Sequence, residues 1–87
     1  MSNGRIDYWS ATWCQPCKVL KPRVVALCKA NDWEFVEYDV DVETSGALGM
    51  GILGVPTIQI TPAFGGFATV LTSDMASILR IKKAMGL

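Results

Sequence analysis

The segment Trp13-Cys14-Gln15-Pro16-Cys17-Lys18 places two cysteines three residues apart at the expected start of a helix. Residues 18–29 carry apolar side chains at helical spacing, so we expect the helix to begin at the cysteines. Free backbone N–H groups and the helix dipole favour negative charge at such a start. We therefore expect a lowered pKa for the thiol of Cys14. Cys17 follows one turn later, close enough to form a disulfide with Cys14.

This pair of thiols predicts a centre for thiol–disulfide exchange. The Cys14 thiolate would attack a disulfide, and Cys17 would then attack the sulfur of Cys14 and release the reduced product. Pro16 presets the first helical turn and has no N–H group to leave unpaired. Trp13 and Pro16 are expected to form a flat apolar rim around the sulfur. Lys18 has two open interpretations, either lowering the pKa of Cys14 or lying solvated at the surface.

Outward from the cysteines, the sequence predicts an α/β chain with the order βαβαββα. The expected strands cover residues 5–9, 33–40, 57–60 and 67–71, and the expected helices start at the cysteines, near residue 44 and at Ser73. The first two strands should be parallel with a right-handed connection, and the last two should form a hairpin. The predicted architecture is a four-stranded mixed sheet with helices on both faces.

The ends of the helices also have sequence signals. Asn31-Asp32 is expected to end the first helix, which has Pro22 in its interior. A short helix is expected over residues 44–50. Ser73 is expected to cap the last helix, whose apolar stripe would consist of Met75, Ile78, Leu79 and Met85.

Length and charge limit the classes of protein that the chain can represent. Its 87 residues fit a single domain, 1–87, and eight basic residues balance eight acidic ones. This balance lacks the basic footprint of a nucleic-acid binder and the polybasic anchor of a lipid-bound protein. No stretch approaches the roughly 18 uninterrupted apolar residues of a membrane span, and the start has no secretory signal. We therefore expect a cytoplasmic protein, in a compartment where structural disulfides are rare.

Four segments, in this order along the chain, resemble the thioredoxin family. They are Ser10–Lys18, Lys21-Pro22, Tyr38-Asp39-Val40-Asp41 and Gly54-Val55-Pro56-Thr57. The resemblance covers roughly residues 6 to 61 and extends loosely to the final hairpin and helix. It implies a thioredoxin fold in a minimal form and a protein-disulfide reductase whose catalytic residues are Cys14 and Cys17. It implies no bound cofactor.

The resemblance also assigns roles around the cysteines. Trp13, Gln15, Pro16 and Lys18 would support the active site, and Trp13, Val55 and Pro56 would bind substrate. Pro56 should follow a cis peptide bond, which would leave the backbone of Val55 able to pair with an extended substrate chain. Gln15 stands where the family has glycine, in the dipeptide that influences the redox potential.

The chain departs from the family pattern beneath the active site. The buried acid of the family falls on Tyr8, and its lysine partner falls on Glu37. Glu37 can replace the acid only if its side chain points inward. The family's opening glycine of the last helix is replaced near Leu71-Thr72. The chain also begins at what would be the family's second strand, so its size is nearer that of a glutaredoxin.

A metal site is disfavoured by the set of available ligands. The chain has no histidine, and Cys28 is its only other thiol. Cys28 falls on the apolar face of the first helix, where we expect it to be a small buried hydrophobe. Zinc would need further ligands, so we expect no metal.

Three functions remain open at this point. The first is a reductase that acts on disulfide-containing proteins and is recharged by a thioredoxin reductase or a similar donor, with ribonucleotide reductase as a candidate client. The second is a glutaredoxin-like reductase recharged by glutathione. The third is a redox-inactive partner subunit with the same fold. For the leading reductase function we expect a monomer without nucleic-acid or membrane partners.

Overall fold

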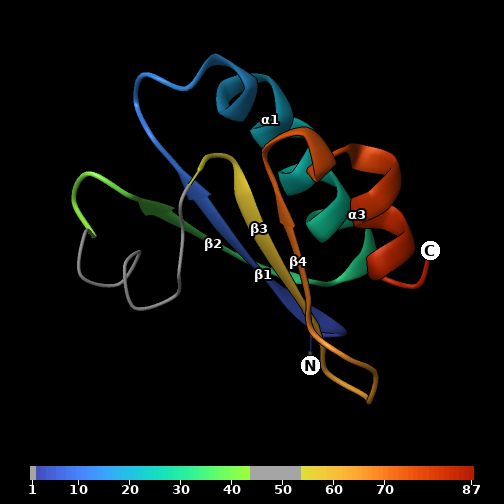
Figure 1. Ribbon diagram of the computed structural model, residues 1–87. Helices are drawn as coiled ribbons and strands as arrows, with labels where there is room; N and C mark the ends of the chain where they lie inside the picture. Colours follow the sequence, from blue (N-terminus) through green and yellow to red (C-terminus); the bar gives the residue numbers. More distant parts are fainter. Residues whose placement is uncertain (1, 44–53) are drawn as a thin grey trace.

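The computed structural model describes residues 2–43 and 54–87. Its elements, in chain order, are β1 (Gly4–Ser10), α1 (Gln15–Asn31), β2 (Glu34–Asp39), β3 (Thr57–Pro62), β4 (Thr69–Thr72), the short 3₁₀ helix η1 (Ser73–Met75) and α3 (Ile78–Ala84) (Figure 1). The helix expected over residues 44–50 lies outside the described residues. No helix within the described ranges is long and apolar enough to cross a membrane.

The four strands form one mixed sheet in the order β2-β1-β3-β4. β1 runs parallel to β2 and antiparallel to β3, and β3 and β4 are antiparallel. The predicted sheet is therefore confirmed. In this register, Tyr8 of β1 lies opposite Glu37 of β2 and Ile58 of β3. Because directly paired residues project to the same face of a sheet, these three side chains share one face.

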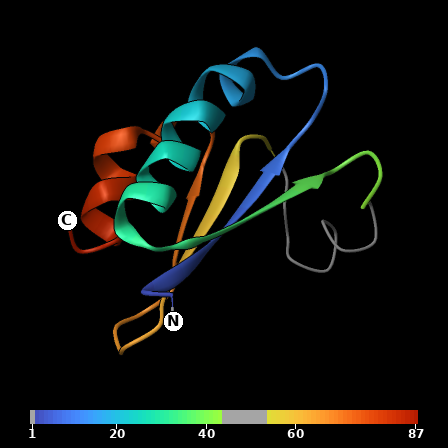
Figure 2. The same ribbon diagram turned by 180° about the vertical axis from the view of Figure 1, so that it is seen from behind.

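The two described α-helices, α1 and α3, cover the same face of the sheet, as the two opposite views show (Figures 1 and 2). The core between them consists mainly of apolar side chains that are almost fully buried: Ile6, Tyr8, Val24, Cys28, Ile58, Ile60, Ile81 and Met85. The expectation of helices on both faces depended on residues 44–50, which lie outside the described part. Within the described part, one face carries α1 and α3 and positions the cysteines.

The opposite face of the sheet carries a second, smaller packing arrangement. Trp9 stacks on Tyr38 with ring centroids 4.3 Å apart. The Tyr38 hydroxyl donates to Asp7 at 3.0 Å, and Arg5 forms an ion pair with the same carboxylate at 2.8 Å. Trp9 and Trp33 are both buried, at most 9% exposed.

Helix α1 begins and ends where the sequence predicts. Cys14 is its N-cap, and Asp32 closes it in the left-handed conformation with φ 57°. The backbone N–H of Asp32 donates to the carbonyl of Cys28, which is a regular C-terminal cap. The helix continues unbroken through Pro22.

The start of the last helix was predicted wrongly. Ser73 does not cap it; Ser73 has φ 48° and begins η1, while Ser77 caps α3 by accepting a bond from the Arg80 N–H at 3.3 Å. The predicted apolar stripe shifts accordingly. Ile81, absent from that stripe, is fully buried, whereas Leu79 is 75% exposed. Residues 73–75 form the separate helix η1, so α3 begins only at Ile78 and buries Ile81.

The last strand also begins later than predicted. β4 starts at Thr69, and Phe67, which we expected to open the strand, is 92% exposed. Gly65 and Gly66 both have positive φ, near 90°, which L side chains rarely adopt. The two glycines therefore give the predicted turn of the hairpin, but the turn extends further toward β4.

Candidate active site

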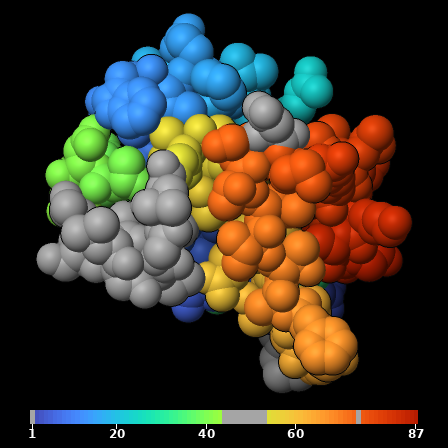
Figure 3. All heavy atoms as spheres, viewed as in Figure 1, coloured from blue at the N-terminus to red at the C-terminus, as the bar shows by residue number. Residues whose placement is uncertain are grey.

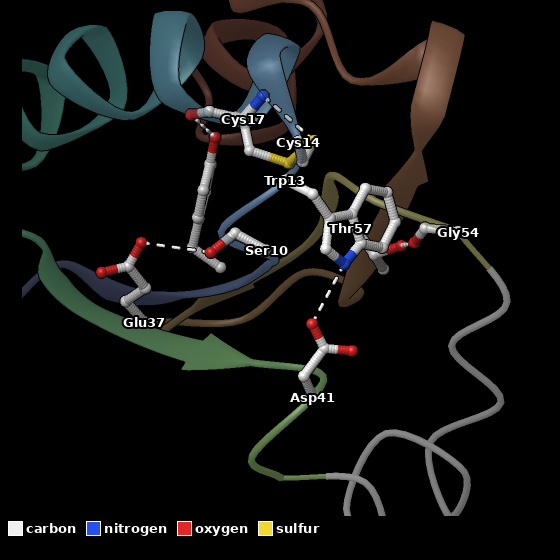
Figure 4. The surroundings of a disulfide bond; sticks show 9 residues. Ser10, Trp13, Cys14, Cys17, Glu37, Asp41, Gly54 and Thr57 are labelled. Atoms are coloured by element: carbon white, nitrogen blue, oxygen red, sulfur yellow. Dashed lines mark hydrogen bonds between the residues drawn. A yellow bond between two sulfur atoms is a disulfide. The ribbon is translucent and has the colours of Figure 1, made fainter.

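Cys14 and Cys17 form a disulfide at the start of α1, with their Cα atoms 5.3 Å apart. The Cys14 backbone N–H donates to the Ala11 carbonyl at 3.1 Å, which fixes the turn before the helix. The Cys17 backbone N–H donates to the Cys14 sulfur at 3.3 Å (Figure 4). In the reduced state, this N–H and the helix dipole would favour a thiolate on Cys14 over a thiol.

The two cysteines differ from their neighbours in exposure. Cys14 is 4% exposed and Cys17 is 2% exposed, whereas the indole-bearing Trp13 is 67% exposed. Gln15, Pro16 and Lys18 are also exposed. Trp13 therefore presents a broad apolar surface beside a sulfur pair that lies almost inside the protein.

The Trp13 ring is held in place by the loop that follows β2. Its Nε1 donates to the Asp41 carboxylate at 3.0 Å, and Figure 4 shows the ring pointing from the start of the helix toward Asp41. Asp41 is itself positioned, because its backbone N–H donates to the Asp39 carboxylate at 2.8 Å. This chain of bonds orients the exposed indole next to the cysteines.

The segment before β3 forms the other side of this end of the molecule. The Val55–Pro56 peptide bond is cis, as the resemblance implied. The Pro56 carbonyl accepts a bond from the Ser73 N–H at 2.7 Å, and the Thr57 hydroxyl donates to the Gly54 carbonyl at 2.6 Å. The space-filling view shows the start of α1 (blue) and the segment leading into β3 (yellow) next to each other at one end (Figure 3).

Tyr8 lies directly beneath the cysteines. It is fully buried, and its hydroxyl donates to the Cys17 carbonyl at 2.7 Å. Burial, and secondarily the negative charge of Glu37, raises the pKa of Tyr8 to about 12. The position at which the family pattern has an acid therefore holds a neutral hydrogen-bond donor.

Glu37 faces the same side of the sheet as Tyr8 and points toward α1. One carboxylate oxygen accepts from Lys21 Nζ at 2.7 Å. The other accepts from the Ser10 hydroxyl at 3.2 Å (Figure 4). Glu37, Lys21, Ser10 and Cys17 line a common cavity of about 360 Å³. Glu37 therefore lies on the α1 side of the sheet and lines this cavity, while its side chain remains 37% exposed to solvent.

The sequence profile of the thioredoxin family matches residues 5–77. The chain belongs to the thioredoxin family.

Individual thioredoxins show how far the likeness extends. Thioredoxin from Gallus gallus is 44% identical over 55 residues, which are 62% of this chain and 51% of that protein. The chain thus spans about half the length of the curated relatives it matches. Thioredoxin O1 from Arabidopsis thaliana, solved in the oxidised state, is 26% identical with a TM-score of 0.79, over 98% of this chain and 77% of that one. Thioredoxin 1 from Thermosipho africanus has a TM-score of 0.83 at 22% identity, over 94% and 90% of the two chains, and shows the likeness in fold.

The third cysteine is set apart from the active site of this thioredoxin family member. Cys28 is unpaired and buried in α1, and burial raises its pKa to about 11. Among residues 2–43 and 54–87, there is no group of three or more histidine, cysteine, aspartate or glutamate side chains that could hold a metal ion. Cys28 therefore packs in the core as a small apolar side chain.

Sequence reasoning assigned no role at the candidate site to several residues that contact it: Ser10, Lys21, Asp41 and Ser73. Two of them had a usable signal. Ser10 follows Tyr8 by two residues on β1, which places both on one face. Lys21 follows Cys17 by four residues, which places both on one side of α1. The contacts of Asp41 and Ser73 depend on loops that meet only in the folded chain.

Proposed function

We propose that the chain, as one domain over residues 1–87, is a thiol–disulfide oxidoreductase that reduces protein disulfides through Cys14 and Cys17. The observation that supports this most strongly is the position of the Cys14 sulfur at the N-cap of α1, where the Cys17 N–H points at it. Membership of the thioredoxin family supports the same activity.

The proposed reaction has two exchange steps. The Cys14 thiolate attacks a substrate disulfide, so that one substrate sulfur leaves as a thiolate and the other stays bound to Cys14. The Cys17 thiolate then attacks Cys14, closing the protein disulfide and releasing the second substrate thiolate. The substrate gains two electrons, and the two protein thiols lose them.

We further propose that the residues around the cysteines bind an extended segment of the substrate protein. Trp13 supplies the exposed apolar contact, and the backbone of Val55, before cis-Pro56, pairs with the substrate chain in the manner of an added strand. Gln15, Pro16 and Lys18 would frame the sulfur at the exposed helix start. Their exposure is compatible with these roles.

The proposal includes an external electron donor, since each turnover leaves Cys14 and Cys17 oxidised. We propose a thioredoxin reductase or a similar flavoprotein as the donor, and ribonucleotide reductase as one client class. We also propose that the protein is monomeric and acts in the cytoplasm. The unpaired thiol of Cys28 is consistent with a reducing compartment, where thiols persist.

Reduction of insulin disulfides by the pre-reduced protein tests the activity. The pre-reduced wild type should reduce and precipitate insulin at stoichiometric amounts, Cys14→Ser should be inactive, and Cys17→Ser should accumulate a mixed disulfide on Cys14. Cys28→Ser is the matched control and should retain activity. Activity that survives Cys14→Ser would refute the assignment of the nucleophile.

The same assay separates the three functions. Recycling by a thioredoxin reductase with NADPH supports the proposal, whereas recycling by glutathione alone would favour the glutaredoxin-like alternative. A biological role that persists in the double variant Cys14→Ser/Cys17→Ser would favour the redox-inactive partner subunit.

A further inference from the structure

The second cysteine must lose a proton inside the protein before it can react. Cys17 is 2% exposed, and only its thiolate can attack the Cys14 sulfur. Bulk water therefore has little direct access to the thiol. The groups and the water of the cavity that Cys17 lines offer a route for this proton.

The cavity beneath the active site supplies such a route. It measures about 360 Å³ and is lined by Cys17 together with Ser10, Lys21, Glu37 and Asp39. Since a water molecule in the liquid occupies about 30 Å³, this volume is large enough to hold a short chain of them between polar walls. Cys17 and the carboxylate-bearing residue Glu37 thus lie in the wall of the same cavity.

We propose that Glu37 is the acceptor of the Cys17 proton, which it receives through water in this cavity. The inference rests on the proposed function, because it concerns the second exchange step. Lys21 and Ser10 each bond one oxygen of Glu37, at 2.7 and 3.2 Å, and hold the carboxylate at the cavity wall. They act as positioning residues.

The charged and titratable groups that face Cys17 come from three elements. β1 contributes Tyr8, α1 contributes Lys18 and Lys21, and β2 contributes Glu37 and Asp39. Tyr8 already donates its hydroxyl proton to the Cys17 carbonyl, and its raised pKa keeps it neutral. The lysines are cations at neutral pH and cannot accept a proton. The choice is therefore between the two carboxylates.

The contacts of the two carboxylates favour Glu37. Asp39 accepts the backbone N–H of Asp41 at 2.8 Å and so shapes the loop after β2. Glu37 lies opposite Tyr8 in the sheet register, and its negative charge acts on the Tyr8 hydroxyl, which in turn bonds to Cys17. The charge of Glu37 is thus directed at the buried end of the active site.

The step balances with groups present in the chain and the substrate. Cys17 gives its proton to the Glu37 carboxylate, which becomes a carboxylic acid. The Cys17 thiolate then forms a bond to the Cys14 sulfur, and the bond between Cys14 and the substrate sulfur breaks. The substrate sulfur leaves with the electron pair and takes up a proton, either from solvent or from Glu37 by way of the cavity water.

The two possible roles of Glu37 predict opposite effects of its neutral isostere, Glu37→Gln. A carboxylate that acts only through its charge makes ionisation of Cys17 harder, so its removal would lower the apparent pKa of Cys17 and speed the second step. A carboxylate that accepts the proton assists that step, so its removal slows the step. General base assistance by a positioned side chain typically contributes about 10²–10⁴-fold.

The test is to load Cys14 with 5-thio-2-nitrobenzoate and follow release of the coloured thiolate by stopped flow between pH 5 and 9. In Glu37→Gln we expect release at pH 7 to be at least about tenfold slower than in the wild type. It should become dependent on hydroxide and be restored in part by added imidazole. Asp39→Asn, in which Oδ1 can still accept from Asp41, is the matched control and should keep the wild-type profile. Thermal unfolding of each oxidised variant checks the fold.

The outcomes distinguish failure of the role of Glu37 from failure of the proposed oxidoreductase function. Unchanged or faster release in Glu37→Gln would overturn the role of Glu37, and equal slowing in Glu37→Gln and Asp39→Asn would overturn its assignment to one carboxylate. A wild type that never releases the coloured thiolate by attack of Cys17 would instead refute the proposed function itself. Loss in Cys17→Ser confirms that the release measured is that attack.

Discussion

The Tyr8 hydroxyl donates a hydrogen bond to the Cys17 carbonyl at a distance of 2.7 Å, so the middle of β1 is joined directly to the first turn of α1. Both groups are buried. The bond crosses from the sheet to the helix beneath the disulfide and helps to set where the start of α1 lies above β1. It also places a neutral donor where a carboxylate would carry charge.

Removal of this hydroxyl should lower the stability of the protein. Tyr8→Phe keeps the ring in the core but loses the bond to Cys17, so we expect the free energy of unfolding to fall by about 1 kcal/mol. Urea unfolding of the oxidised protein measures this. An unchanged midpoint and slope would show that the bond contributes nothing to stability.

Alkaline pH should destabilise the wild type through the same residue. The pKa of Tyr8 is about 12 in the folded protein and about 10 in the unfolded chain, so the unfolded chain loses the proton first. The contribution is therefore complete below pH 10 and is lost as the pH rises toward 12. By pH 12, the wild type should have lost about 2 kcal/mol more than Tyr8→Phe, measured by urea unfolding across this range. Parallel pH profiles for the two proteins would contradict this account.

The sequence predicts most of the fold because local signals and packing agree. The β-forming run of β1 and the left-handed stop at Asp32 appear in the structure close to where the sequence predicts them. The start of the last helix shows the limit of this reasoning. Ser73 and Ser77 are equally suited to cap a helix. In the structure the Ser73 N–H is instead bonded to the Pro56 carbonyl, a contact between distant segments, and Ser77 caps the helix.

The site was predictable to a similar degree. The spacing of Cys14 and Cys17 predicts the disulfide and the helix cap, and the structure has both. Alternation along β2 places Glu37 on one face, but its partner Lys21 depends on where α1 crosses the sheet. The position of α1 across the sheet depends on the strand order and on the packing of the core. No short segment of the sequence determines either of them.

Loss of the hydrogen bond between Trp13 and Asp41 should weaken substrate binding more than it lowers the stability of the protein. Asp41→Ala removes the acceptor of the indole N–H, and the exposed ring would then have to be ordered when substrate binds. We expect KM for insulin to rise about fivefold, equivalent to about 1 kcal/mol, while kcat changes little. Steady-state kinetics measure both constants.

The control for this prediction is Asp41→Asn, whose side-chain oxygen can still accept the indole N–H. It should keep KM within about twofold of the wild type. If Asp41→Ala and Asp41→Asn raise KM equally, the charge of Asp41 rather than its bond to Trp13 acts on substrate.

Cys28 should resist alkylation in the folded protein. Its pKa is raised from 9 to about 11, which lowers its thiolate fraction at pH 8 about a hundredfold, and its side chain is buried. Iodoacetamide at pH 8 should label Cys14 of the reduced protein first and Cys28 only after unfolding in urea. Peptide mass spectrometry of the labelled protein follows the order. Labelling of folded Cys28 at the rate of an exposed cysteine would disprove its assignment to the core.

The pKa of the Cys14 thiol tests most directly whether the start of α1 activates this sulfur. In Cys17→Ser, the absorbance of the thiolate near 240 nm can be followed against pH, with Cys28 titrating separately near 11. The position of Cys14 at the helix cap predicts a pKa within the range of about 3.5–7.5 found for thiols at such sites. A pKa at or above about 8.5, the value of an ordinary cysteine, would contradict the central claim that the start of α1 activates this sulfur.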